Sequence, residues 1–182
     1  MTPEMRVQIL EGAKSAFFEA MIDGYVGGEN RRSVKVKDDD GYTTITYTTE
    51  DGKYKVEDRF CTNPFSDEAA GTTTVFCRFA LIWAPVWWME YSGHYTEGVI
   101  PLLKSALTKA YERRLFLGGR GLARVDDKSY VSNDLKFNLT YTNTYHGDFS
   151  SFDGTEKIIQ NPLDGFDPET IGYHKYSGMS LL

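Results

Sequence analysis

Two carboxylates in strand-like segments are the first candidates for chemistry. Asp58 interrupts the otherwise apolar face that alternation gives to residues 53–61, and Glu90 lies in the strand-like segment 86–95. A carboxylate held against apolar surface has a raised pKa unless it is paired, and such groups concentrate at functional sites. Both residues are therefore candidates for ligand binding or acid–base work. The alternative to a functional role for Asp58 is that it lies at the solvent-exposed end of the hairpin or pairs with a nearby Arg or Lys.

A short phrase that occurs twice relates Glu90 to a lysine. Residues 86–93 read VWWMEYSG and residues 171–178 read IGYHKYSG, so the Tyr-Ser-Gly triplet recurs about half a chain later. The repeat predicts two related halves, each a helix followed by antiparallel strands, with a ligand crevice between them. Lys175 stands where the first copy has Glu90. The two side chains are predicted either to form an ion pair across the crevice or to contact a ligand.

Aromatic side chains around this phrase predict a small-molecule site. Aromatic residues make up 14% of the chain, and alternation lets only some of those near the phrase face a core. The others must line a groove, a pocket or a partner surface. The leading hypothesis is a non-enzymatic ligand-binding or sensory domain for a small aromatic or hydrophobic molecule. Its predicted contacts are Asp58, Trp88, Glu90, Tyr91, Lys175 and Tyr176.

The same residues allow two other functions. A hydrolase or isomerase would use Glu90 or Asp58 as the acid/base, assisted by Tyr91 or His94. An interaction module would instead dimerise through exposed aromatic side chains, with Trp87 facing the other subunit. The sequence contains no catalytic signature and its three histidines are widely separated, so we expect neither a metal nor a cofactor.

Composition restricts the partners. The formal net charge of −6 and the pI of about 5.1 argue against a nucleic-acid-binding surface. No apolar run approaches the ~18 residues of a membrane span, and the start lacks the apolar core of a secretory signal. We therefore expect a cytoplasmic protein with no membrane partner and no direct nucleic-acid binding. A small-molecule ligand and a homodimer are the partners that remain.

Hydrophobic periodicity predicts the elements that position these residues. Helical spacing predicts helices over residues 3–22 and 98–115, and alternation predicts strands between and after them. The dipeptide Asp51-Gly52 favours a two-residue type I′ hairpin, which pairs Ile45 with Asp58.

Other local signals indicate breaks in these elements. Pro85 is expected to end a strand over residues 72–84. The glycine-rich segment 118–121 is interpreted as a flexible connector or an anion cradle. We expect one α+β domain over residues 1–182, with two helices on a curved, mainly antiparallel sheet and internally duplicated halves at about 1–96 and 97–182.

Several segments resemble a known bacterial family. Residues 85–93 (PVWWMEYSG) and 103–107 (LKSAL) resemble a domain-of-unknown-function family found alone or C-terminal to Xre-type helix-turn-helix domains. Residues 152–158 (FDGTEKI) and 173–178 (YHKYSG) are similar to its closing motifs, and the resemblance covers about residues 54–182. The resemblance implies the fold and an association with predicted regulators. Because the family has no assigned activity, the resemblance implies no reaction.

Overall fold

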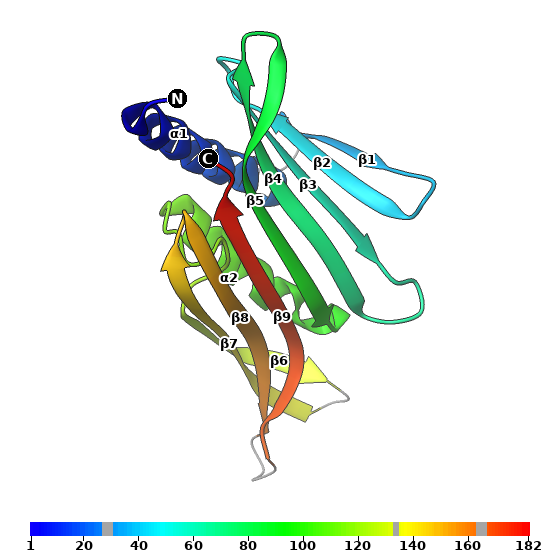
Figure 1. Ribbon diagram of the computed structural model, residues 1–182. Coiled ribbons are helices and arrows are strands. Elements are labelled where there is room, and N and C mark those ends of the chain that lie inside the picture. The colour runs from blue at the N-terminus through cyan, green and yellow to red at the C-terminus, as the bar shows by residue number, and fades with distance from the viewer. Residues whose placement is uncertain (27–30, 133–134, 163–166) are drawn as a thin grey trace.

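The chain folds as two helices and nine strands in a computed structural model (Figure 1). The structure describes residues 1–26, 31–132, 135–162 and 167–182. A short 3-10 helix, Glu97–Val99, precedes the second α-helix. The elements are α1 Pro3–Val26, β1 Val34–Lys37, β2 Tyr42–Thr48, β3 Tyr54–Thr62, β4 Glu68–Phe79, β5 Ile82–Tyr95, α2 Ile100–Glu112, β6 Arg124–Ser132, β7 Leu135–Asp148, β8 Ser151–Pro162 and β9 Glu169–Ser180.

The strands form one open antiparallel sheet in the order β1-β2-β3-β4-β5-β9-β8-β7-β6. Figure 1 shows both helices on the same side of this curved sheet, behind it in that view. Helix α1 packs on strands of the first half, β2 to β5, and α2 packs on β6 and β7 of the second. The predicted α+β class, with two helices on a curved antiparallel sheet, is confirmed. Neither described helix is long and apolar enough to cross a membrane.

The two copies of the Tyr-Ser-Gly phrase lie side by side at the centre of the sheet. Strand β5 ends the first half and β9 ends the second, and the two strands pair antiparallel with Tyr91 opposite Tyr176. The pairing is symmetrical about these tyrosines, because Gly93 lies opposite His174 and Met89 lies opposite Gly178. The register therefore brings the two copies of the phrase directly opposite each other.

Alternation along β5 places its side chains on two faces, and the structure shows which of them faces the core. Trp87, Met89 and Tyr91 are buried on the helix side, whereas Glu90 is exposed on the opposite side. The Trp87 indole stacks on Phe149, with ring centroids 4.7 Å apart, and its Nε1–H donates to the Phe149 carbonyl at 2.8 Å. Trp87 is thus part of this chain's own core and is not available to a second subunit.

Two local turn predictions are corrected. The register that pairs Ile45 with Asp58 is confirmed, but the type I′ turn is wrong. Gly52 alone of the two turn residues has a positive φ, and the Gly52 N–H donates to the Thr49 carbonyl in a longer loop. Pro85 does not end a strand: the chain turns earlier, at Ala80, whose φ is 54°.

The structure accommodates Pro85 inside β5 because of two local features. Pro85 lies beside the register shift that separates Val75 from Phe76 in β4. On the side of β5 that faces β9, pairing begins only at Trp87, so Pro85 has no partner strand there among the described residues. A proline lacks a backbone N–H, so a bulge or an unpaired edge is where a strand tolerates it. The predicted helices are also adjusted, because α1 runs past Gly24 to Val26 and α2 is shorter than residues 98–115.

Candidate functional site

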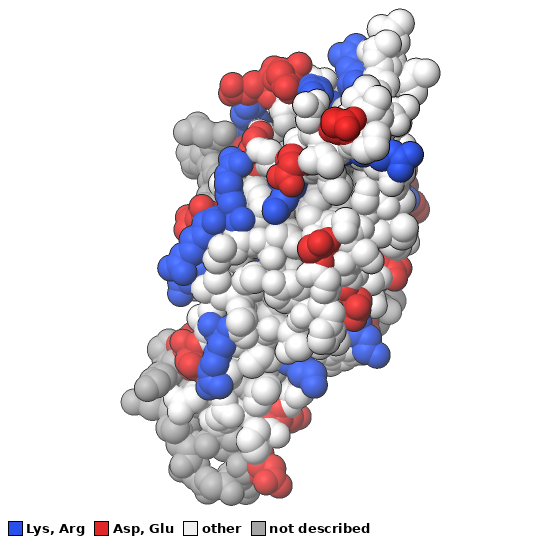
Figure 2. Space-filling view, turned by 60° about the vertical axis from the view of Figure 1, so that its left-hand side comes forward, with Lys and Arg blue, Asp and Glu red and all other residues white. Residues whose placement is uncertain are grey.

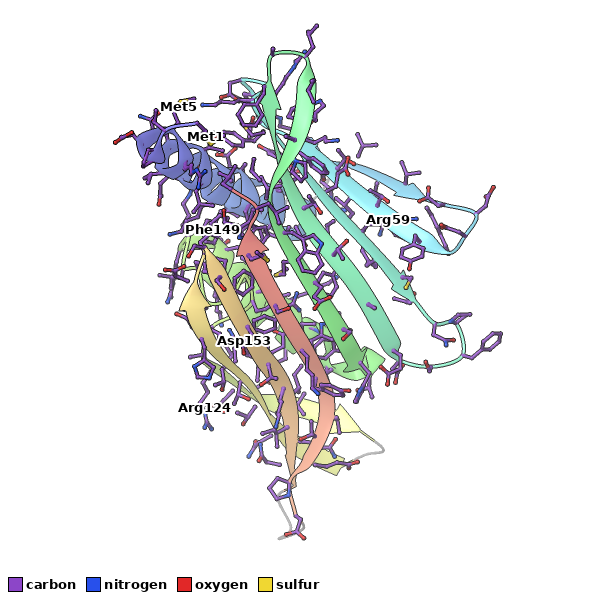
Figure 3. All side chains as sticks on the ribbon, in the orientation of Figure 1. Met1, Met5, Arg59, Arg124, Phe149 and Asp153 are labelled. Carbon is purple, nitrogen blue, oxygen red and sulfur yellow. The ribbon has the colours of Figure 1, made fainter. Side chains whose placement is uncertain are left out.

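A groove of about 760 Å³ lies across the sheet face opposite the helices. Its floor spans the junction of the two halves, from β3 through the central pair to β8. Figure 3 shows Arg59 over the first half and Asp153 over the second, with β5 and β9 between them. The lining residues are Tyr42, Arg59, Ala70, Gly71, Thr72, Glu90, Tyr91, Ser92, Asp153, Gly154, Thr155, Lys175, Tyr176 and Ser177.

Strand register arranges the floor of this groove in two cross-strand rows. One row runs Arg59, Thr72, Glu90, Ser177 and Asp153, each directly opposite the next. The neighbouring row, two residues further along each strand, runs Ala70, Ser92, Lys175 and Thr155. Most of the uncharged members are small or carry a hydroxyl group, so a ligand could approach the sheet closely and hydrogen-bond to it.

The charged residues of the groove differ in whether they have a partner within the protein. Arg59 pairs with Asp40 at 3.0 Å and lies over the Tyr42 ring. Glu90 accepts a hydrogen bond from Ser177 Oγ at 3.1 Å. Lys175 and Asp153 take part in none of the side-chain hydrogen bonds or salt bridges found among the described residues. On the face drawn in Figure 2, Lys and Arg are interspersed with Asp and Glu, so neither sign forms one broad patch.

On the other face of the same strands, Asp58 is buried beneath the helices. Only 4% of Asp58 is exposed, and its Oδ1 accepts hydrogen bonds from the hydroxyls of Thr73 and Tyr91, both at 2.9 Å. Burial raises the pKa of this carboxyl despite those two donors. Its Oδ2 has no hydrogen-bond partner among the described residues.

The second half repeats this arrangement with an amide. Tyr176 donates to Asn143 Oδ1 at 2.5 Å, as Tyr91 does to Asp58. In each half the tyrosine crosses a glycine of the neighbouring strand, Gly71 for Tyr91 and Gly154 for Tyr176. A Cβ atom at either glycine would overlap the tyrosine's phenol group. The two glycines are therefore required by a close approach of side chains on the buried face.

An ion pair is buried between the second half and the connection that follows α2. Arg120 donates to Glu156 from both Nε, at 2.7 Å, and Nη2, and the Tyr141 hydroxyl donates to the other carboxylate oxygen at 2.5 Å. Burial by itself would raise the pKa of Glu156, but the guanidinium of Arg120 outweighs it and holds that pKa below its ordinary value. The same guanidinium lies 5.5 Å from the ring centre of Tyr91, so it bridges the two halves.

His174 completes this buried polar cluster. Its Nδ1 lies 3.7 Å from Glu156 Oε1, and its ring centroid lies 4.5 Å from that of Tyr95. Burial, together with the positive charge of Arg120, lowers the pKa of His174 to about 3, so the imidazole is neutral at pH 7. A cavity beside Asp58 measures about 10 Å³, room for about one water molecule. The cluster is packed as part of the core.

The structure divides the predicted site residues between the two faces. Glu90 and Lys175 present their side chains to the groove, and Tyr91 and Tyr176 line it while their side chains lie in the buried cluster. Asp58 belongs to the buried cluster alone. Trp88 lies opposite Met179 outside the groove, and His94 lies 3.9 Å from Glu68. Glu90 pairs with Ser177 instead of Lys175.

Sequence reasoning missed Glu156 and the role of Arg120. Alternation places Glu156 on the same face as Phe152 and Ile158, so it interrupts an apolar pattern in the way Asp58 does. That signal could have identified it. Arg120 carries no such signal, since it lies in an irregular glycine-rich connection. The structure shows that this connection is neither a free linker nor an anion cradle, because its arginine is committed to Glu156.

Comparisons with family models, curated proteins and solved structures gave no match. The resemblance to the bacterial domain-of-unknown-function family is therefore still a prediction. Among the described residues, no three His, Cys, Asp or Glu side chains are grouped as a metal site. The functional argument accordingly depends on the geometry of the groove.

Proposed function

We propose that this protein is a non-catalytic small-molecule-binding domain whose ligand occupies the groove on the outer face of the sheet. The observation that carries the proposal is a groove of about 760 Å³ whose floor is built largely from small and hydroxyl-bearing residues. That volume is within the range typical of small-molecule sites. The groove also lies at the junction of the two halves, where the repeated phrase predicts a ligand.

The lining residues favour a polar ligand over the aromatic or hydrophobic one expected from the sequence. The aromatic side chains of Trp87, Tyr91 and Tyr176 are used in the core or the buried cluster. The groove instead offers Glu90 and Lys175, together with hydroxyl groups and Asp153. Hydrogen bonds from a polar ligand would satisfy these groups, whereas an apolar ligand would desolvate them without replacement.

Positions of the candidate acid/base residues argue against the enzymatic alternative. Asp58 and Glu90 lie on opposite faces of the sheet, so they cannot act together on one molecule in the groove. His94 does not line the groove either. A general acid/base needs hydrogen-bond reach to its substrate, which leaves Glu90 without a catalytic partner among these candidates.

A groove-blocking variant tests the proposal. Ser177→Trp places an indole in the middle of the floor, and Lys157→Trp adds the same group to an exposed position of β8 outside the groove. Ligand-detected NMR with a mixture of polar metabolites should identify a binder of the unmodified protein. We expect Ser177→Trp to weaken that binding at least about tenfold and Lys157→Trp to leave it unchanged. Equal binding by both variants, or no binder at all, would contradict the proposal.

A further inference from the structure

Three charges at the centre of the groove form an alternating pattern. Glu90 and Asp153 lie in one cross-strand row, each directly opposite Ser177 on a different side. Lys175 lies two residues along β9 from Ser177 on the same face, and is therefore diagonal to both carboxylates. The centre of the groove thus presents one cation flanked by two anions.

Two other basic side chains on this face are paired with carboxylates. Lys55 pairs with Glu57 at 2.7 Å, and Arg59 pairs with Asp40 at 3.0 Å. Within the part of the chain that the structure describes, Lys175 and Asp153 take part in no comparable ion pair, and Glu90 has only the hydroxyl of Ser177. The central charges of the groove are therefore free to act on a ligand.

Hydroxyl groups beside each charge can bind the same kind of ligand group that the charge attracts. Lys175 lies between Ser92 and Thr155 in its row. The ammonium group and the two hydroxyls can all donate hydrogen bonds to a ligand carboxylate. Glu90 and Asp153 lie on either side of Ser177, whose oxygen can also accept from an ammonium group. One row can therefore hold an anion, and the other can hold cations.

The spacing of the two carboxylates sets the size of the ligand. Adjacent strands are about 4.8 Å apart, so the backbones of Glu90 and Asp153, two strands apart, are separated by about 10 Å. Both side chains can lean toward the centre over part of that distance. A molecule of amino-acid size can then contact both carboxylates while its own carboxylate lies near Lys175.

From this pattern we infer that the ligand is a small amphoteric molecule with two cationic groups and one carboxylate, as in a basic amino acid. The inference rests on the proposed function and specifies its ligand class. The ligand carboxylate pairs with Lys175, and its two cationic groups pair with Glu90 and Asp153. A net positive charge on the ligand complements the net charge of −6 on the protein.

Three related probes separate the contributions of these charges. L-lysine carries all three groups, norleucine lacks the side-chain cation, and cadaverine lacks the carboxylate. Losing one charge-assisted hydrogen bond corresponds to a loss of affinity of about tenfold or more. Calorimetric titration of the full chain should therefore show L-lysine binding at least about tenfold more tightly than either analogue.

Variants assign each preference to its residue. Lys175→Met should abolish the preference for lysine over cadaverine, and the double variant Glu90→Gln, Asp153→Asn should abolish the preference over norleucine. Lys157→Met, at an exposed lysine of the same face outside the groove, should keep both preferences. Thermal unfolding of each variant checks that these exposed substitutions leave the fold intact.

The outcomes distinguish the inference from the proposed function. If the three probes bind equally, or if lysine does not bind while another polar molecule binds in a way that Ser177→Trp blocks, the ligand class is wrong and the groove is still the site. If no small molecule binds in a way that Ser177→Trp blocks, both statements are wrong.

Discussion

The two halves of the sheet place the same tyrosine in the same register but give it different partners. Tyr91 donates to the carboxyl group of Asp58, and Tyr176 donates to the amide of Asn143. Asp58 lies opposite Thr73 in the first half, and Asn143 lies opposite Glu156 in the second. Similar backbones therefore hold a carboxyl–hydroxyl pair in one half and an amide–carboxylate pair in the other.

The requirement for donors explains this difference. The Nδ2 group of Asn143 donates to the carbonyls of Leu117 and Gly121, at 2.9 and 3.0 Å, and so ties down both ends of the connection that carries Arg120. A carboxylate cannot donate to a carbonyl. Asp58 receives two hydroxyl donors and needs only to accept. The second half thus uses its polar residues to hold the connection that follows α2.

Removing the counter-ion of the second half should have the largest effect. Arg120→Met leaves Glu156, which is 0% exposed, as an uncompensated buried charge. We expect the free energy of unfolding to fall by about 3–5 kcal/mol, measured by urea denaturation. Arg59→Met, which removes an exposed pair with Asp40, should cost less than about 1 kcal/mol. Similar losses in both variants would show that the buried pair is not the special feature of the second half.

The next largest effect is expected when Asn143 of the second half is replaced by Asp, the residue type that the first half has at Asp58. Asn143→Asp removes both hydrogen bonds to the carbonyls of Leu117 and Gly121 and places a carboxyl group against these two acceptors. We expect a loss of about 3 kcal/mol in the free energy of unfolding. Hydrogen exchange should also show faster opening of residues 117–121. A stable variant with an unchanged exchange rate would mean that these bonds do not hold the connection.

His174 distinguishes the halves at the position where the first half has Met89. Its folded pKa of about 3 lies below the ordinary value near 6.5, so the unfolded chain binds the proton more readily. The stabilisation is therefore present above pH 6.5 and is lost as the pH falls toward 3. Between pH 7 and pH 5 we expect a loss of about 2 kcal/mol that His174→Met does not show. Parallel pH profiles of the two proteins in urea denaturation would contradict this assignment.

The smallest expected effect is an increase in the free energy of unfolding when Asp58 of the first half is replaced by Asn. The raised pKa of Asp58 means that the folded state holds the proton more tightly than the unfolded chain does. The associated stability is present below about pH 3.9 and is lost as the pH rises through the folded pKa. Asp58→Asn keeps the acceptor without the titration, so at pH 7 it should be more stable than the unmodified protein by on the order of 1 kcal/mol. If Asp58→Asn instead destabilised the protein at pH 7 in urea denaturation, the native carboxylate would be ionised and fully paired.

Much of the buried face could be predicted from local patterns. Alternation placed Trp87 and Glu90 on opposite faces of their strand, and the turn residues predicted the pairing of Ile45 with Asp58. The same pattern marked Asp58 as a charge on an apolar face. These features depend on the two-residue period of a strand, which is encoded within a few neighbouring residues.

The groove and the buried ion pair were decided by contacts between distant segments. Glu90 and Lys175 were expected to face each other, but the register of β5 and β9 places Ser177 opposite Glu90 and leaves Lys175 diagonal to it. Arg120 meets Glu156 because the connection after α2 returns to the sheet, and no local pattern reports that return. The sequence by itself determined which residues of a strand share a face, because alternation is local. Only the tertiary structure decided which of those residues meet, because the register of strands far apart in the chain depends on the packing of the whole sheet.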